Sequence, residues 1–260
     1  MIHINTSPRH FSTAIAFLLG CLAVGLTACV GQNDNPKSDV IYDYPVKPGT
    51  QEWRVLKSHD EMLKVCQIPD ALLHKMSTKA LVETVLNYPL YGDIFAYLNF
   101  QAGFNSVASN FNGISELLNR KDAGTELLAR YRAMDPAAID KSWTLLQQGQ
   151  YDTKFTYIEM LLAQYAILAS LTETERHDLL ADALKKSQAK QKYSEIYGQF
   201  GLERTALLMG RILQKENFAP FNQKAREDAT LRAFLGDGAT ATDTILNEIF
   251  SQAKEFLAQR

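Results

Sequence analysis

Residues 245–257 read Ile-Leu-Asn-Glu-Ile-Phe-Ser-Gln-Ala-Lys-Glu-Phe-Leu, which is the pattern of an amphipathic helix. The apolar side chains at Ile245, Ile249, Ala253 and Phe256 recur every three or four positions and so share one helix face. The same spacing recurs at residues 81–86, 104–111 and 161–168. No run of β-branched residues alternates with the period of two that indicates a strand. The sequence therefore predicts an all-α fold.

Residues typical of helix ends separate these apolar stretches. The stretches between them accommodate about nine to twelve helices of 8–20 residues. Such helices form either an irregular multi-helix bundle or a short α-solenoid-like array, and the lack of a fixed repeat length favours the bundle. Helix starts are expected at Ser58-x-x-Glu61, Asp135-Pro136 and Thr172-x-x-Glu175, and helix ends at Asn87, Gly149, Gly198 and Gly201.

Composition narrows the class of protein. The 260 residues carry 27 basic and 29 acidic side chains, a formal net charge of -2, and 46% of them are hydrophobic. An apolar composition without low-complexity runs excludes a disordered chain. A near-neutral charge gives no reason to expect nucleic acid as a partner, because that requires a basic face.

The first thirty residues have the layout of a signal peptide. Arg9 and His10 precede an apolar stretch of 16 residues, from Phe11 to Leu26. A membrane-spanning helix needs ~20 residues, so we predict that this segment is cleaved rather than retained as a span.

The junction that follows, Leu26-Thr27-Ala28-Cys29, resembles the lipobox of bacterial lipoproteins. The resemblance covers the export segment alone. It implies that residues 1–28 are removed and that Cys29 becomes the first residue, carrying a diacylglycerol thioether and acyl chains such as palmitate. A thiolate is the nucleophile that this transfer requires, and two or more acyl chains anchor a protein stably.

The same resemblance implies an address for the protein. A lipid on Cys29 would hold it at the cell membrane on the extracytoplasmic side. Val30 follows the cysteine, and lipoproteins without Asp at that place usually go to the outer membrane in a cell with two membranes. The membrane is therefore the expected partner of Cys29.

Three segments are predicted, with bounds 1–28, 29–51 and 52–260. The second is the lipidated cysteine with a flexible tether, because prolines and polar residues interrupt any periodicity there. An extended arm over residues 40–44 is the alternative, since Val40, Tyr42 and Tyr44 alternate to one side. The third is a single all-α domain, long enough to bury about 70–75% of its unfolded surface.

No catalytic motif is recognisable, so no catalytic residue, cofactor or metal is predicted. Cys66 is spaced seven and eight residues from His59 and His74, which does not suit a zinc site, and we expect it in the core. The Gly-Asp-Gly-Ala-Thr-Ala run at 236–241 follows a helical stretch and is interpreted as a helix end and restart. Acidic pairs at 173 and 175 and at 178 and 182 are interpreted as helix surface.

Residues 88–111 hold seven aromatic side chains among asparagines. Rings beside amides suit a sugar or peptide groove, since ring faces cover apolar patches and amides both donate and accept hydrogen bonds. Tyr91, Tyr97 and Asn99 are the candidate ligand-binding residues, and the hypothesis requires that they share one concave exposed surface. The alternative is that the rings pack helix junctions and the asparagines cap helices.

A second region of interest is residues 185–192, with four lysines in eight positions. These lysines suit either contact with anionic lipid or wall polymer, or an ordinary solvated helix surface.

Residues 53–124, including Leu-Asn-Tyr-Pro-Leu at 86–90, are similar to uncharacterised exported bacterial proteins, a resemblance that assigns no site residue. The leading hypothesis is a non-catalytic envelope lipoprotein whose helical domain binds another envelope protein or a wall-associated ligand. The alternative is a hydrolase of cell-wall or extracellular glycan that uses unmarked carboxylates. A deep pocket with two acids of separated pKa would favour the enzyme, and a shallow apolar surface the binding module.

Overall fold

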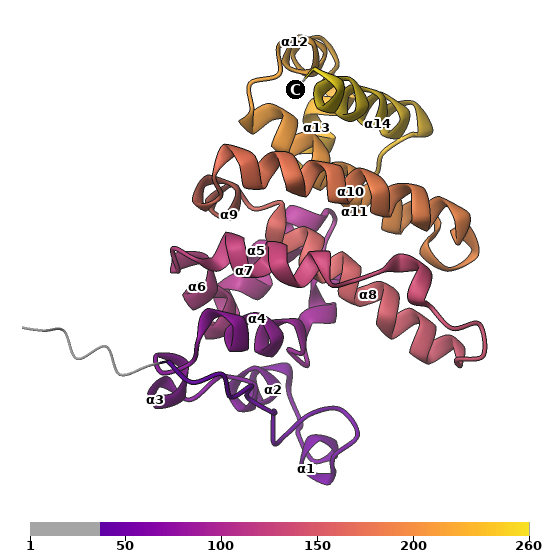
Figure 1. Cartoon of the computed structure of the whole chain (residues 1–260). Coiled ribbons are helices and arrows are strands. Elements are labelled where there is room, and N and C mark those ends of the chain that lie inside the picture. Colours follow the sequence, from indigo (N-terminus) through magenta and orange to yellow (C-terminus); the bar gives the residue numbers. More distant parts are fainter. Residues whose placement is uncertain (1–36, 260) are drawn as a thin grey trace, which may run out of the picture. The chain divides into compact units, whose positions relative to one another are not determined.

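The protein is all-α in a computed structural model that describes residues 37–259. The described residues form fourteen α-helices and two 3-10 helices, and ten of the α-helices have eight residues or more, within the predicted number. The elements (Figure 1) are α1 (Gln51–Arg54), α2 (His59–Val65), α3 (Asp70–Leu73), α4 (Thr78–Leu86), η1 (Tyr91–Ala96), α5 (Phe100–Asn110), α6 (Asn112–Asn119), α7 (Ala123–Arg132), η2 (Pro136–Ala138), α8 (Leu145–Leu162), α9 (Tyr165–Ser170), α10 (Glu173–Lys192), α11 (Ser194–Lys215), α12 (Ala219–Glu227), α13 (Ala229–Asp237) and α14 (Asp243–Ala258).

Helix α11 lies at the centre of the packing. All residues from Glu203 to Leu213 are buried, so this helix needs partners on every face. Helices α8, α10, α12, α13 and α14 supply them, and Figure 1 shows α10 and α11 side by side. Because one helix contacts so many others, the architecture is a multi-helix bundle rather than an array in which each unit touches only its neighbours.

Helix α4 has the corresponding role among the earlier helices. Its apolar residues Leu81, Val82, Val85 and Leu86 are buried, as their spacing predicts, and it packs against α6, α7 and α8. The stretch 161–168, in contrast, is not one helix. The helix is interrupted at Gln164, which lies between α8 and α9. The apolar residues of this stretch therefore belong to two helices.

The described part of the predicted tether is an arm packed on the helices. Ser38 pairs with the strand-like backbone at Met76, the Tyr42 amide donates to Thr84 Oγ1 at 3.1 Å, and the Tyr44 hydroxyl donates to the Thr84 carbonyl at 3.1 Å. Tyr44 is 2% exposed and its ring belongs to the core. Residues 38–44 are therefore an extended arm rather than part of a flexible segment reaching residue 51. Of the three alternating residues, Tyr42 and Tyr44 pack on the helices, whereas Val40 is 62% exposed.

Local sequence signals place most helix ends. Thr172 and Glu175 form the predicted capping box of α10, Asn87 ends α4, and Gly238 in the left-handed conformation (φ +63°) ends α13. Gly198 (φ +52°) interrupts α11 after its first turn. The expectation that Gly149 ends a helix is wrong, because Gly149 lies inside α8.

Buried cations bind the carbonyl groups near other helix ends. These carbonyls have no partner within their own helix, and a cation there also interacts favourably with the helix dipole. The carbonyls bound in this way are those of Leu73 and Met76 (to Arg120, 2.9 and 2.7 Å), of Ala163, Leu235 and Gly236 (to Arg211, 3.1, 2.9 and 2.8 Å), and of Met134 (to Lys186).

None of the helices between residues 37 and 259 combines the length and the apolar character that crossing a membrane requires. Cys29 and the predicted signal peptide lie outside the described residues.

Candidate functional site

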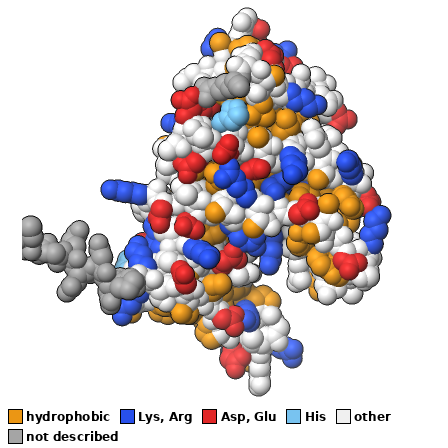
Figure 2. Space-filling view, viewed as in Figure 1, with side chains coloured by type: hydrophobic (Ala, Val, Ile, Leu, Met, Phe, Trp, Pro, Cys, Tyr) orange, Lys and Arg blue, Asp and Glu red, His pale blue; other side chains and the backbone are white. Residues whose placement is uncertain are grey.

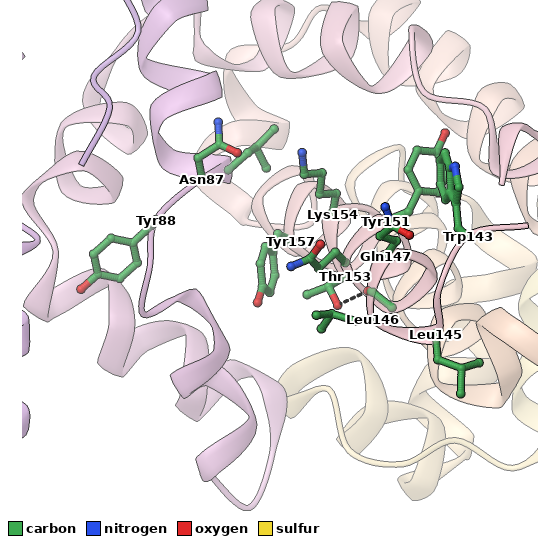
Figure 3. Close-up of a pocket in the computed structure, with 13 residues that line it drawn as sticks. Asn87, Tyr88, Trp143, Leu145, Leu146, Gln147, Tyr151, Thr153, Lys154 and Tyr157 are labelled. Atoms are coloured by element: carbon green, nitrogen blue, oxygen red, sulfur yellow. Dashed lines mark hydrogen bonds between the residues drawn. The ribbon is translucent and has the colours of Figure 1, made fainter. Parts of the chain in front are cut away.

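A groove of about 900 Å³ separates the end of α4 from the first half of α8. It is broadly open to solvent, and Figure 2 shows the surface hollowed beside the part of the molecule that carries the start of α8. Figure 3 shows that the two walls come from distant parts of the chain. One wall carries Asn87 and Tyr88, and the other carries Trp143, Leu145, Leu146, Gln147, Tyr151, Thr153, Lys154 and Tyr157.

Capping fixes both walls. Helix α4 ends where the Asn87 amide bonds back to the carbonyls of the last turn and Asn87 Nδ2 donates to the Glu83 carbonyl at 2.9 Å. Helix α8 begins with a capping box in which Thr144 Oγ1 accepts from the Gln147 amide and Gln147 Oε1 accepts from the Thr144 amide at 2.9 Å. The groove is thus framed by the C-terminal end of one helix and the first turns of another.

Three partly exposed rings line the α8 wall. Trp143 packs edge-to-face on Tyr151, with ring centroids 5.5 Å apart, and Tyr157 stacks on the buried Tyr91 at 3.8 Å. Burial raises the pKa of Tyr157 to about 12, so its hydroxyl is neutral and able to donate. Tyr88 contributes no ring face, because its ring stacks on Phe111 at 3.8 Å and points away from the groove (Figure 3).

The polar lining consists of amides, hydroxyls and one cation. Gln147 uses its carbonyl oxygen in the capping box, which leaves the amide nitrogen without a partner among the described residues, while Gln150 is exposed. Lys154 is the only charged residue among those that line the groove, and no Asp or Glu lines it. The arrangement can therefore hold a ligand by stacking and hydrogen bonds, and it favours neutral or acidic groups over cations.

An apolar strip adjoins the groove at Tyr157. The Phe95 ring lies 6.4 Å from Tyr157 and 5.6 Å from Phe200, and both phenylalanines are about two-fifths exposed. Leu98, three residues after Phe95, is fully exposed. Phe95, Leu98 and Phe200 are called the apolar strip here, and ring contacts join Phe95 both to Phe200 and to Tyr157 of the groove.

The three candidate residues from the sequence do not share one exposed surface. Tyr91 is completely buried, and its hydroxyl donates to the Tyr157 carbonyl at 3.3 Å. Tyr97 is 47% exposed and contacts Ser106. Neither Tyr91 nor Tyr97 lines the groove. Asn99 caps α5 by accepting from the Ala102 amide at 2.8 Å. The concave surface that the ligand hypothesis required of these three residues is therefore not formed.

The lysine cluster at 185–192 is only half on the surface. Lys190 is fully buried, and its ammonium donates to both carboxylate oxygens of Glu159, at 2.8 and 3.0 Å, and to Thr205 Oγ1 at 3.0 Å. Tyr131 donates to the same carboxylate at 2.8 Å. Lys186 is also buried. The interpretation of the four lysines as a solvated helix surface is therefore wrong for Lys186 and Lys190.

Asp152 lies beside this buried ion pair. Its Oδ1 is buried without a hydrogen-bond partner among the described residues, and burial together with the charge of Glu159 raises its pKa to about 6 although Lys190 opposes the shift. These two carboxyl groups lie outside the groove, since neither Asp152 nor Glu159 lines it. They form a structural cluster of the α8, α10 and α11 packing.

Cys66 is fully buried, as expected of a core residue, and burial raises the pKa of its thiol to about 11. His59 contacts Asp93 at 3.2 Å and His74 lies 3.9 Å from Glu116, on separate parts of the surface. Within residues 37–259, no three His, Cys, Asp or Glu side chains are grouped so that they could hold a metal ion.

The groove residues were missed by reasoning from the sequence. The available signal was local: Trp143, Tyr151 and Tyr157 with Gln147 and Gln150 place rings and amides within 15 residues. The opposite wall begins at Leu86, 57 residues before Trp143, and no local pattern reports that the two segments meet.

No family model matches this chain, and neither a curated protein nor a solved structure is significantly similar to it.

Proposed function

We propose that this protein is a lipid-anchored cell-envelope protein whose helical domain binds a wall-associated glycan in the groove between α4 and α8, without catalysing a reaction. The observation that carries the proposal is the composition of the groove: three partly exposed rings, several amides and one lysine, with no carboxylate among its lining residues. The anchor is proposed from the resemblance of Leu26-Thr27-Ala28-Cys29 to a lipobox.

The chemistry of the groove supports a glycan. A pyranose has apolar C–H faces that pack on Tyr and Trp rings, and hydroxyls that amide side chains bind as donor or acceptor. The groove is broadly open to solvent, so a ligand that extends beyond its lining residues is not excluded by its walls. Lys154 supplies a positive charge for acidic groups on such a polymer.

The alternative of a glycan hydrolase has no support at this site. A glycosidase requires two carboxyl groups on either side of the scissile bond, about 5–10 Å apart. Asp152 and Glu159 belong to a cluster outside the groove, and Lys190 and Tyr131 both donate hydrogen bonds to Glu159. The groove therefore favours binding over hydrolysis.

The binding test uses the soluble Cys29→Ser protein and soluble glycan fragments prepared from envelopes, with affinity measured by calorimetry. Trp143→Ala and Gln150→Ala should each weaken binding about tenfold or more, because truncation of a central aromatic or hydrogen-bonding group typically costs about 2 kcal/mol. Their melting temperatures should stay within a few degrees of the parent. Tyr97→Ala is the matched control, since Tyr97 is exposed but outside the groove, and should leave affinity unchanged.

The proposal fails if the glycan fragments do not bind, if wall peptides bind instead, or if Tyr97→Ala weakens binding as much as Trp143→Ala. The anchor has its own test: mass spectrometry of the amino-terminal peptide should find a glyceride on Cys29, and Cys29→Ser should move the protein from the membrane to the soluble fraction.

A further inference from the structure

The chain enters the described bundle at one end. The arm of residues 38–44 and the helices α1, α2 and α3 lie together at that end, and α12, α13 and α14 lie at the opposite end (Figure 1). The arm is fixed there because Ser38 pairs with Met76 and Tyr44 is buried.

The fixed arm leaves a short connection to the proposed anchor, on which this inference rests. Lys37 is only eight positions after Cys29 in the sequence. Eight residues span at most about 28 Å when fully extended, and about 16 Å on average as a flexible coil. A tether running to residue 51 would be 22 residues long and reach about 75 Å. A lipid on Cys29 would therefore keep the arm end of the bundle close to the bilayer surface.

Exposed apolar side chains lie at the same end. Val40 is 62% exposed, Ile41 49% and Val55 66%, although all three are held by ordered neighbours. Tyr42 and Trp53 pack against the core from the same two segments. The three aliphatic side chains are therefore held at the surface by the packing of their neighbours, and nothing among the described residues covers them.

The charge of the chain is also distributed unevenly between this end and the rest of the bundle. Residues 37–79 carry seven basic and six acidic side chains, whereas residues 80–260 carry nineteen and twenty-two. In the described part of this second segment, five basic side chains are buried but only two acidic ones. Its surface is consequently acidic, and a bilayer containing anionic lipids repels it more than it repels the arm end. The buried residues are Arg120, Lys186, Lys190, Arg204 and Arg211, and Glu159 and Glu203.

We propose that the arm end, defined by Val40, Ile41 and Val55, rests on the lipid bilayer that carries the anchor. A connection of eight residues holds this end at a high effective concentration beside the membrane, so weak apolar contacts suffice to keep it there. The opposite end of the bundle, with α12 to α14, faces away from the membrane.

The test uses acylated full-length mature protein in vesicles of phosphatidylcholine and phosphatidylglycerol that contain spin-labelled phosphatidylcholine as quencher. An environment-sensitive fluorophore is attached to Val55→Cys or, as the matched control, to Ser251→Cys, an exposed position on α14. We expect the label at 55 to be quenched at least twofold more than the label at 251. Equal quenching at the two positions overturns the proposal.

A second variant separates apolar contact from mere proximity. Val40→Asp with Ile41→Asp, in the protein labelled at 55, should reduce the quenching at least twofold, whereas Leu98→Asp, a still more exposed position on the apolar strip, should not. Unchanged quenching in the double variant overturns the apolar contact.

Mass spectrometry of the same samples distinguishes the two proposals. If Cys29 carries no glyceride and the protein leaves the vesicles, the proposed anchor and this inference fail together. If Cys29 carries the glyceride and the label at 55 is not quenched, the anchor stands and this inference alone is wrong.

Discussion

Asp152 combines a buried, unpartnered oxygen with a raised pKa, and this makes the stability of the bundle depend on pH. Its ordinary pKa is 3.8, and in the folded protein it is about 6. Well below pH 3.8 the carboxyl is protonated in both the folded and the unfolded state. As the pH rises from about 4 to 6, the unfolded chain loses this proton first, so the free energy of unfolding falls, and above pH 6 the loss is constant.

Asp152→Asn removes this penalty, because an amide has nearly the same shape and does not ionise. We expect the variant to be more stable than the parent by about 1–3 kcal/mol at pH 7.5. The difference should shrink towards zero near pH 4. Urea unfolding of both proteins at several pH values measures it, and a difference that does not change with pH would contradict the assignment to Asp152.

At the scale of single helices, replacing either of two glycines by alanine should change the stability of the protein in opposite directions. Gly149 lies inside α8 with open space around its missing side chain, so Gly149→Ala should stabilise the protein by about 0.5–1 kcal/mol. Gly103 on α5 faces the backbone of Ile94 in η1, where a Cβ would lie 2.1 Å from the carbonyl oxygen. Gly103→Ala should destabilise it by about 3 kcal/mol.

Thermal unfolding of the two alanine variants measures this contrast. One kcal/mol corresponds to about 2–4 °C for a protein of this size. Gly149→Ala should therefore raise the melting temperature by a few degrees and Gly103→Ala should lower it by about 10 °C. A lowered value for Gly149→Ala would mean that α8 does not continue through this position.

The same elements show which parts of the fold a local pattern can predict. The capping box at Thr172 and the end of α4 at Asn87 depend on neighbours within four residues, and both are confirmed. Gly149 was predicted to end a helix because glycine favours helix ends. The helix continues through it since Thr144 caps it on one side and buried Phe155 fixes it in the core on the other.

Features made by distant residues could not be predicted in this way. Lys190 can be buried because it pairs with Glu159, which lies 31 residues earlier. Nothing in the lysine-rich sequence itself indicates this partner. Tyr91 was selected as a ring beside amides, but it packs under Tyr157, 66 residues later. The groove is also formed by segments that lie far apart in the sequence. The fold class could therefore be predicted from the sequence, but the groove could not.

For the molecule as a whole, the arm should contribute to the stability of the bundle through Tyr44. Tyr44 is 2% exposed, contacts Phe111 and donates to Thr84. Tyr44→Ala should therefore reduce the free energy of unfolding by about 3–5 kcal/mol, as for other buried aromatic truncations. Val40→Ala, four residues earlier and exposed, should change it by less than about 0.5 kcal/mol.

Chemical denaturation of these two variants in the Cys29→Ser background provides the measurement. A similar stability for Tyr44→Ala and the parent would show that residues 38–44 are not part of the folded bundle, and would restore a longer tether.

The contacts of the arm also impose an order of events on synthesis. Tyr42 and Tyr44 bind Thr84, and the Tyr44 ring meets Phe111, 67 residues later. A ribosome adds about 5–20 residues per second, so Tyr44 is added to the chain roughly 3–13 s before Phe111. The first segment of the bundle to be made is therefore among those that must wait for later residues before they can fold.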